Sequence, residues 1–556
     1  MEADRIGTAE LREKLREAAS AISAEYWLLA VGALGQIVFR LITFSVSYDY
    51  VFLLGSALCF LRRGHFANFV VSVKDLSSPF DVPMTQWPPG FSFCVAILTR
   101  VLGGVYAAMV GFDLIFMAIF FAACGLLLAR MAPSFPKRAR LLSAFTLAFV
   151  APSYVEYGTN VASLGLFLVS LVLILPGRDD RPPSLVACSL AGVLSAFTIG
   201  FRYASGPASL VPILVLGVAG RRSRDGRARL LAAAVGWVAG FAPLLAWLAR
   251  TRVTGLAPLR LEGRWFPENL LRLQAFAGDA LFGRHLTSIF PRSTYHFIPN
   301  VDMLQYELRH LLSVVVLLAA IVGIRELIRH SRGTPEGAVI RRIFIVGGVA
   351  SLATIAMLVL LTVRHAPVMF MGQWVYMEAA RYYAVCLPFI VFGAAMIAAS
   401  SAKDWVPRTL KVLALAIFLV AGVAWAYEIP SAWRQIRRSH VGGPIDAHLD
   451  EGGGFADGLR RLTASDMPNA SIEFGGSVFS TWLHGALATG FDVPFATVLN
   501  GETPHARKDV NVIACVSLKA LPEHQQAFDT FCREHAGQPE RIGDCVFCRV
   551  LLRGGA

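Results

Sequence analysis

Long apolar runs, separated mostly by short basic loops, are the feature of this sequence that most restricts its fold. A helix needs about 20 apolar residues to cross a bilayer, and about eleven runs approach or exceed that length. Runs 141–155 and 205–220 are short for a full crossing. Backbone polar groups in lipid must be satisfied within their own segment, so each run is expected to be helical. The expected spans are 26–47, 104–129, 141–155, 161–176, 184–201, 205–220, 230–249, 311–327, 343–363, 382–399 and 409–427.

The composition agrees with a polytopic α-helical membrane protein surrounded by membrane lipids. Of the 556 residues, 55% are hydrophobic and only 16% are charged, which is more apolar surface than a water-soluble globule needs. The net charge of +13 would suggest a nucleic-acid partner in a soluble protein. Here the basic excess lies mainly in loops between apolar runs, where it reports topology, so no nucleic-acid partner is expected.

The basic loops also predict the orientation in a bacterial inner (plasma) membrane. When the N-terminus is placed in the cytoplasm, every inner loop is basic, as the positive-inside rule requires. With eleven spans the C-terminus then lies outside. The basic residues of these inner loops are Arg130, Lys137, Arg138 and Arg140; Arg178 and Arg181; Arg221, Arg222, Arg224, Arg227 and Arg229; Arg325, Arg329, Arg341 and Arg342; and Lys403, Arg408 and Lys411.

Three regions follow from this map. Residues 1–25 carry apolar positions at helical spacing and predict an amphipathic helix on the cytoplasmic leaflet. Residues 26–429 form the membrane module, with outer loops at 48–103 and 250–310. Residues 430–556 change character, with expected strands at 511–516 and 545–552 and a helix at 522–535, and predict a small extracytoplasmic α/β domain.

The first outer loop contains two half-hydrophobic stretches. Residues 51–63 predict a short interfacial helix that ends at Gly64. Pro88 and Pro89 suit the start of the next helix, where a missing N–H costs little. Residues 90–102 are too short to span, so they form a second interfacial helix or extend the second span.

Four cysteines lie in the C-terminal region, where an extracytoplasmic location allows disulfides. Cys532 could form a disulfide with either Cys545 or Cys548, and the sequence does not choose between the two pairings. Cys545 and Cys548 also have C-x-x-C spacing, which by itself is a weak signal for a metal or redox site.

Asp49 follows the first apolar run and is the main candidate for chemistry. An ionised carboxylate is costly at a membrane exit, and partial burial would make it a better base. Such a base could take the proton of a hydroxyl group that attacks a substrate. The alternative structural role is an N-cap for the helix at 51–63, and both roles are compatible.

Basic and polar groups at the outer ends of spans provide candidates for binding the phosphate of a lipid-linked substrate. Arginine suits phosphate because it donates a planar fork of hydrogen bonds, although each arginine could equally reach to lipid headgroups. Glu156 could instead form a salt bridge to Arg202. The candidates for donor phosphate binding are Arg202, Arg381, Lys74 and Tyr382, and those for the substrate pocket are His65, Glu156, Trp87, His365 and Glu378.

The chain resembles the GT-C superfamily of integral-membrane glycosyltransferases, in the bacterial branch related to aminoarabinose transferases and protein O-mannosyltransferases. The resemblance covers about 430 residues in architecture and only short motifs in sequence. Those motifs are Asp49-Tyr50, Ala57, Gly64-His65, Trp87-Pro88-Pro89-Gly90, Arg381-Tyr382 and Pro388.

The resemblance implies an inverting transfer of a hexosyl or pentosyl group from a polyprenyl-phosphate sugar to a glycan, lipid or protein acceptor, with Asp49 as the catalytic carboxylate. Many relatives have an acidic pair where this chain has Asp49-Tyr50, so no metal ligand is assigned and a divalent-metal cofactor is left open. Many also have lysine where this chain has Trp87, so Arg202, Arg381 or Lys74 would have to meet the phosphate.

Three other functions are compatible with a polytopic membrane chain. The main alternative is a polytopic transporter or flippase of lipid-linked sugar, but no pairing of broken helices between two halves is evident. A polysaccharide polymerase or ligase would be expected to use Arg and His in its outer loops. A non-catalytic scaffold would leave Asp49 replaceable.

Overall fold

The structure is a computed structural model, and it divides into two compact units, each of which is treated by itself. The helical unit comprises Met1–Val38, Asp113–Trp247 and Leu256–Pro430, and the sheet unit comprises Phe39–Phe112, Leu248–Gly255 and Ser431–Ala556. The residues that the structure describes are 23–42, 48–83, 87–132, 135–150, 158–175, 181–220, 223–251, 314–315, 318–319, 321–333, 335–363, 369–370, 373–374, 385–399, 408, 411–412, 415–416, 419, 455–463, 467–474, 493–498, 502–518, 521–542 and 545–554.

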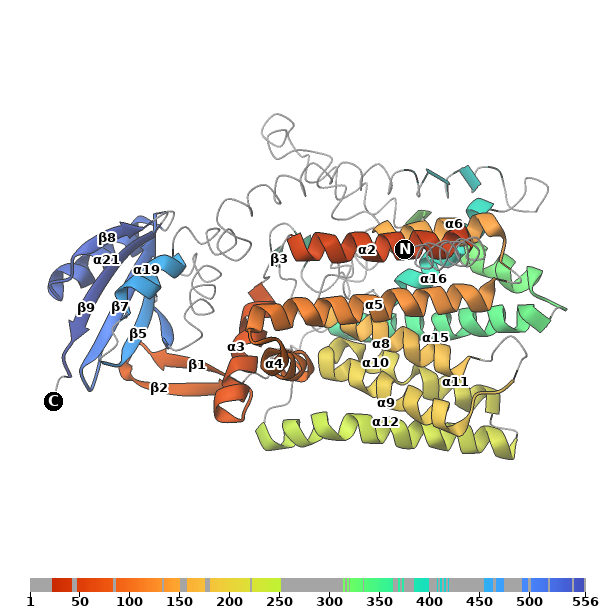
Figure 1. Cartoon of the computed structure of the whole chain (residues 1–556), viewed down its shortest axis with the longest axis horizontal. Helices are drawn as coiled ribbons and strands as arrows, with labels where there is room; N and C mark the ends of the chain where they lie inside the picture. Colours follow the sequence, from red (N-terminus) through yellow and green to blue (C-terminus); the bar gives the residue numbers. More distant parts are fainter. Residues whose placement is uncertain are drawn as a thin grey trace, which may run out of the picture. The chain divides into compact units, whose positions relative to one another are not determined.

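The helical unit contains long helices that run roughly parallel to one another (Figure 1). Its core is apolar, with fully buried rings such as Phe120, Phe167 and Phe392. The helices that lie wholly or mainly in this unit are α2 (Ala24–Ile42), α5 (Val105–Met131), α6 (Lys137–Phe145) with a π-helix (Thr146–Val150), α8 (Thr159–Ile174), α9 (Leu185–Phe201), α10 (Gly206–Ser209), α11 (Val211–Gly220), α12 (Arg224–Thr251), α15 (Pro335–Val363) and α16 (Leu387–Ala399).

Within the described residues, three helices are long and apolar enough to cross a membrane. They are Ala107–Met131, Arg224–Thr251 and Gly337–Met357, and shorter apolar helices include Thr159–Ile174 and Leu185–Phe201. The total of about eleven spans therefore stays a prediction. The run at 205–220 is divided between α10 and α11, and the run at 141–155 begins within α6 and continues into the π-helix.

Helix α12 has the surface expected of a helix in lipid. It buries small residues such as Gly236 and Gly240, whereas Leu231, Val235 and Val238 are each more than half exposed. In water this arrangement would leave a row of large apolar side chains unburied. In lipid no such cost arises, and small residues allow the helix backbones to approach closely.

The contact between α9 and α12 depends on that close approach. A Cβ atom added at Gly236 would lie 2.1 Å from the Ser189 carbonyl oxygen, and one at Gly192 would lie 2.1 Å from the Ala233 carbonyl oxygen. A Cβ at Gly240 would lie 2.7 Å from the oxygen of Val193. The two helices therefore meet backbone to backbone along a stripe of small residues.

Polar contacts between helix ends test the expected alternation of the spans. Glu25, in the first turn of α2, is 1% exposed, and its Oε1 lies 3.0 Å from Nε of Arg140 in the first turn of α6. Both ends are expected on the same side of the membrane. Three further contacts also join helix ends that are expected to share a side. Arg130 donates to the Leu175 carbonyl, and Arg229 Nε donates to the Pro183 carbonyl at 2.9 Å. The hydroxyl oxygens of Ser163 and Ser205 lie 2.5 Å apart. These contacts agree with the alternation; which side is the cytoplasm stays a prediction.

The sheet unit joins the first outer loop to the C-terminal region. Helix α3 (Tyr48–Arg63) leads into a hairpin of β1 (Ala67–Ser72) and β2 (Asp75–Pro83), and helix α4 (Gly90–Leu102) follows. Figure 1 shows the hairpin reaching from α3 into the C-terminal sheet. The remaining elements of the unit are α19 (Phe455–Leu462), β5 (Asn469–Phe474), β6 (Phe495–Val498), β7 (Val510–Ser517), α21 (Pro522–Glu534), β8 (Pro539–Ile542) and β9 (Cys545–Leu552).

In the described part of the chain these strands form one seven-stranded sheet in the order β2-β1-β6-β5-β7-β9-β8. Strand β1 pairs with β6 in parallel, with Val70 opposite Phe495. Strands β5, β6 and β7 are parallel to one another, whereas β9 is antiparallel to both β7 and β8. The expected α/β character of the C-terminal region is confirmed, and the hairpin from the first loop enlarges its sheet.

Helices α19 and α21 cover opposite faces of this sheet. A Cβ atom at Gly458 of α19 would lie 2.5 Å from the Phe547 ring, whereas Cys532 of α21 packs beside Cys548. Phe547 and Cys548 are consecutive in β9, and consecutive side chains on a strand point to opposite faces. Because Cys545 shares the face of Phe547, the C-x-x-C pair cannot converge on one metal ion, and Cys548 is the thiol that lies near Cys532.

Candidate active site

Asp49 is the second residue of α3, which begins at Tyr48 rather than at residue 51. Asp49 therefore lies within the helix and does not cap it from outside. The position of the Asp49 side chain lies outside the described part of the structure.

An aromatic stack brings the second sequence motif to this end of α3. The rings of Phe52 and Trp87 are stacked, with centroids 5.8 Å apart and planes inclined by 21°. Phe52 follows Asp49 by three residues, and residues three apart lie on the same side of a helix. The turn that contains Trp87 therefore packs within one helical turn of Asp49.

The start of α4 explains why Trp87 is held there. Pro88 is buried and Pro89 is the N-cap residue of α4, so the two prolines set the entry into the helix, as their sequence predicts. In the first turn of α4, the buried Ser92 hydroxyl donates to the Leu53 carbonyl at 2.8 Å. Helix α4 is separate from α5, because Gly103 ends it in a left-handed conformation with φ +75°.

The structure places His65 and Lys74 away from the first turn of α3. His65 follows the last turn of the helix, roughly 20 Å from Asp49 along the axis at 1.5 Å per residue. It is exposed and bonds to Asp81. Lys74 is also exposed and lies in the turn between β1 and β2. Their roles toward substrate stay predictions.

The other candidates belong to the helical unit or lie outside the description. Arg202 is the C-cap residue of α9 and is half-buried, and its backbone N–H donates to the Thr198 carbonyl at 3.0 Å. It belongs to a different unit from Asp49, so their separation is not defined. The candidates outside the described residues are Glu156, His365, Glu378, Arg381 and Tyr382.

Sequence reasoning missed the attachment of the hairpin to the C-terminal domain. The backbone N–H of Leu76 donates to the His505 carbonyl at 2.8 Å, and the N–H of His505 donates to the Val73 carbonyl at 2.9 Å. Leu76 and Val71 are buried in the same core as β5, β7 and α21. An apolar position inside a polar loop, such as Leu76, is the only local signal that could have indicated this contact.

The ionised carboxylate of Asp75 helps to attach the hairpin to the C-terminal region. This carboxylate accepts from the backbone N–H of Arg507 at 3.3 Å, and it lies 3.6 Å from the Arg507 guanidinium. Partial burial would raise the pKa of the Asp75 carboxyl. Hydrogen bonds from the hydroxyls of Ser77 and Ser78 and from the N–H groups of Arg507 and Ser77 outweigh burial and lower that pKa to about 2. The carboxylate is therefore ionised at any physiological pH.

Comparison with solved structures identifies the fold. The chain matches the apo crystal structure of ArnT from Cupriavidus metallidurans with a TM-score of 0.52 and 11% identity, over 94% of this chain and 97% of that one. The chain has a GT-C fold. The match covers nearly all of both chains, while the identity is too low to transfer an activity.

Two further solved structures were found at lower TM-scores. ArnT from Cupriavidus metallidurans bound to undecaprenyl phosphate gives 0.46 at 12% identity, over 95% of this chain and 98% of that one. The apo oligosaccharyltransferase of Archaeoglobus fulgidus gives 0.44 at 13% identity, over 92% and 72%. Comparison with protein-family models and with curated protein sequences finds no match.

Proposed function

We propose that this GT-C chain is an integral-membrane glycosyltransferase that moves a sugar from a polyprenyl-phosphate donor to an acceptor on the extracytoplasmic side. The stacking of Trp87 on Phe52 carries the proposal, because it brings the Trp87-Pro88-Pro89 turn beside the helical turn of Asp49. These are two of the motifs in the first outer loop that the resemblance names.

In the proposed reaction Asp49 accepts the proton of the acceptor hydroxyl. The acceptor oxygen attacks the anomeric carbon from the side opposite the phosphate. A new glycosidic C–O bond forms as the bond between the anomeric carbon and the phosphate oxygen breaks, which inverts the configuration. Polyprenyl phosphate leaves with the electron pair of that bond.

The leaving phosphate needs positive charge and hydrogen-bond donors. We assign this role to Arg202 and Arg381, with Tyr382 and Lys74 as further candidates. His65, Glu156, Trp87, His365 and Glu378 are the candidates for contact with the sugar or acceptor. ArnT, whose apo structure shares this fold, has also been crystallised with undecaprenyl phosphate. That complex makes a polyprenyl phosphate the first donor carrier to test here.

The test uses full-length protein reconstituted into liposomes with radiolabelled polyprenyl-phosphate sugars. The donors are mannose, arabinose, glucose and a uronic acid, each tested separately with a membrane extract as acceptor source. A general base contributes about 100-fold or more to rate, so Asp49→Asn is expected to lower transfer by at least that factor. Near-normal turnover by Asp49→Asn would remove the base assignment.

Asp225→Asn is the matched control for this experiment. Asp225 is likewise the second residue of a helix, α12, and its side chain is exposed. The control should transfer at the wild-type rate. If labelled donor instead crosses the bilayer with its sugar–phosphate bond intact and no transfer is detected with any donor, the transporter alternative replaces the glycosyltransferase.

A further inference from the structure

Three side chains that commonly bind metals meet at the far end of α3 from Asp49. The Cys59 Sγ, a ring nitrogen of His65 and a carboxylate oxygen of Asp81 all lie within 4.8 Å of one another. Cys59 is buried, Asp81 is partly buried and His65 is exposed. In the part of the chain that the structure describes, no other group of three such residues is as close.

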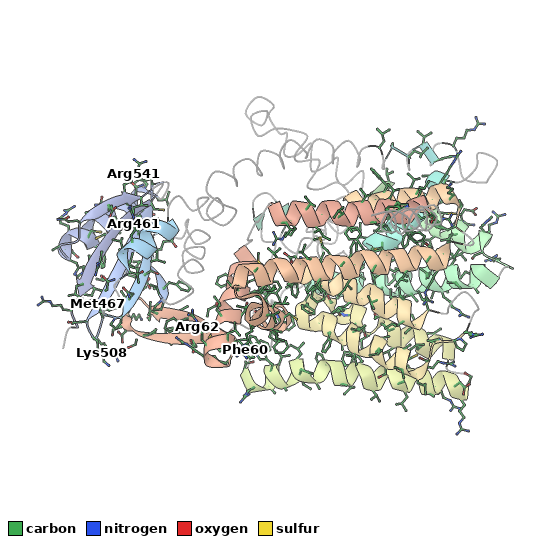
Figure 2. All side chains as sticks on the ribbon, viewed as in Figure 1. Phe60, Arg62, Arg461, Met467, Lys508 and Arg541 are labelled. Atoms are coloured by element: carbon green, nitrogen blue, oxygen red, sulfur yellow. The ribbon has the colours of Figure 1, made fainter. Side chains whose placement is uncertain are left out.

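The local fold brings these residues together from three elements. Gly64 ends α3 in a left-handed conformation, with φ +78° and its N–H bonded to the Phe60 carbonyl at 2.9 Å. The chain then turns back, and the Phe66 ring stacks on Phe60 with centroids 4.4 Å apart. Figure 2 labels Phe60 at this end of α3. Pairing of β1 with β2 places Asp81 opposite Phe69 and so beside the end of the helix.

The hydrogen bonds of His65 orient it as a ligand. Its Nδ1 lies 3.1 Å from the Arg63 carbonyl oxygen, which can only accept, so Nδ1 carries the hydrogen. The other nitrogen, Nε2, faces the Asp81 Oδ2 atom at 2.7 Å. A histidine that donates from one nitrogen to a backbone carbonyl presents its other nitrogen in the manner typical of metal ligands.

The contact between Nε2 and Oδ2 needs a cation, either a proton or a metal ion. A proton would satisfy His65 and Asp81 alone. A metal ion would in addition engage the Cys59 thiol, whose sulfur lies within 4.8 Å of both other ligand atoms. A thiolate, an imidazole and a carboxylate together suit zinc, which binds three such ligands and keeps a fourth position for water.

We propose that Cys59, His65 and Asp81 bind one Zn²⁺ ion that fastens the β1–β2 hairpin to the end of α3. Ligand atoms around a tetrahedral zinc lie roughly 3 to 4 Å apart. On binding, the longest distance between the three ligand atoms must therefore shorten by about 1 Å, and the distance between His65 Nε2 and Asp81 Oδ2 must lengthen slightly. Arg63 bonds to the other Asp81 oxygen at 2.5 Å and holds the carboxylate in place. The exposed edge of His65 gives the ion access from solvent.

This zinc site is separate from the proposed catalytic site at Asp49, and as a zinc ligand His65 has a structural role in place of the substrate contact considered for it above. The site lies roughly 15 to 20 Å from Asp49 along α3, so the ion would be structural rather than part of the reaction. The attachment matters because the hairpin that it would fasten continues into the C-terminal sheet.

The test measures metal binding by the full-length protein in detergent. Protein stripped with a chelator is titrated with Co²⁺, and zinc content is measured on protein purified without chelator. The wild type is expected to bind one Co²⁺ with a thiolate-to-cobalt charge-transfer band and the strong d–d absorption of tetrahedral cobalt, and added Zn²⁺ should displace it. Cys59→Ser should lose the charge-transfer band, and His65→Ala and Asp81→Asn should each weaken binding by at least about 10-fold.

Cys94→Ala is the matched control, because Cys94 lies on the neighbouring helix α4 and does not belong to the cluster. It should bind Co²⁺ like the wild type. Folded wild-type protein that takes up neither metal would overturn the proposal, and so would a Cys59→Ser spectrum identical to that of the wild type. In either case His65, Asp81 and Arg63 form a simple ion-pair cluster. The wild-type titration decides the matter even if a variant fails to fold.

Discussion

Different forces stabilise the interior of each of the two units of this protein. In the helical unit, α9 and α12 meet through backbone contacts at glycines, and large apolar side chains of α12 face outward. In the sheet unit, the β1–β2 hairpin is joined to the C-terminal region by backbone hydrogen bonds and by the Asp75 carboxylate. Lipid removes the hydrophobic drive between helices, so shape decides their contacts. Water-facing elements can use charge, which makes their contacts sensitive to pH.

The largest effect on stability is expected at the contact between α9 and α12, where the fit of the two helix surfaces determines the packing. Gly236→Ala should destabilise the helical unit by about 3 kcal/mol, because the new Cβ meets the helix backbone at Ser189 rather than a movable side chain. The free energy of unfolding is measured by denaturant titration in mixed micelles. Gly200→Ala, on α9, is the control, since a Cβ there meets nothing within 4 Å and should not destabilise. Equal stability of the two variants would contradict the close α9–α12 contact.

A smaller effect is expected at the hairpin. Asp75→Asn removes a charge-assisted hydrogen bond and should cost about 1.5 kcal/mol, read as faster hydrogen exchange of the Leu76 amide. The native carboxyl has its pKa lowered to about 2 from an ordinary value of 3.8. Its stabilisation is therefore complete above about pH 4 and is lost as the pH falls toward 2. The Asn variant should lack this pH dependence; an unchanged profile would show that Asp75 does not hold the hairpin.

The smallest effect is expected for the aromatic stack beside Asp49. Phe52→Ala and Trp87→Ala should show a coupling free energy of about 1 kcal/mol in a double-mutant cycle of unfolding. Both single variants should also lower transfer, because Trp87 would no longer be held within a turn of Asp49. Strict additivity in the cycle would mean that the two rings do not depend on each other.

The sequence predicted the local elements of the sheet unit well. The helix at 51–63, its end at Gly64, the start of α4 at Pro89, and the elements β7, α21 and β9 all agree with the structure to within a few residues. Each has a signal in neighbouring residues: an apolar period, a glycine or a proline. The α/β character of the C-terminal region could therefore be predicted directly.

The hairpin could not be predicted in this way. Strand β2 lies at the edge of the sheet and contains Pro79 and two serines, and its apolar residues Phe80 and Val82 are exposed. The pairing of Val70 with Phe495 joins residues more than 400 positions apart, which no local pattern reports. No local pattern places Asp49 near Trp87 either. The sequence suggested a shared site only from the two motifs, and the stacking of Trp87 on Phe52 supplies the contact that brings the motifs together.

The most direct measurement is an experimental structure of the protein with a polyprenyl-phosphate sugar bound. Asp49 acting as base on the acceptor predicts the anomeric carbon within roughly 6 Å of its carboxylate, because one hydroxyl oxygen must lie about 3 Å from each. Trp87 should line the same cavity. Donor bound elsewhere, or an Asp49 side chain enclosed by packed protein with no cavity beside it, would contradict the proposed catalytic role and leave only the fold.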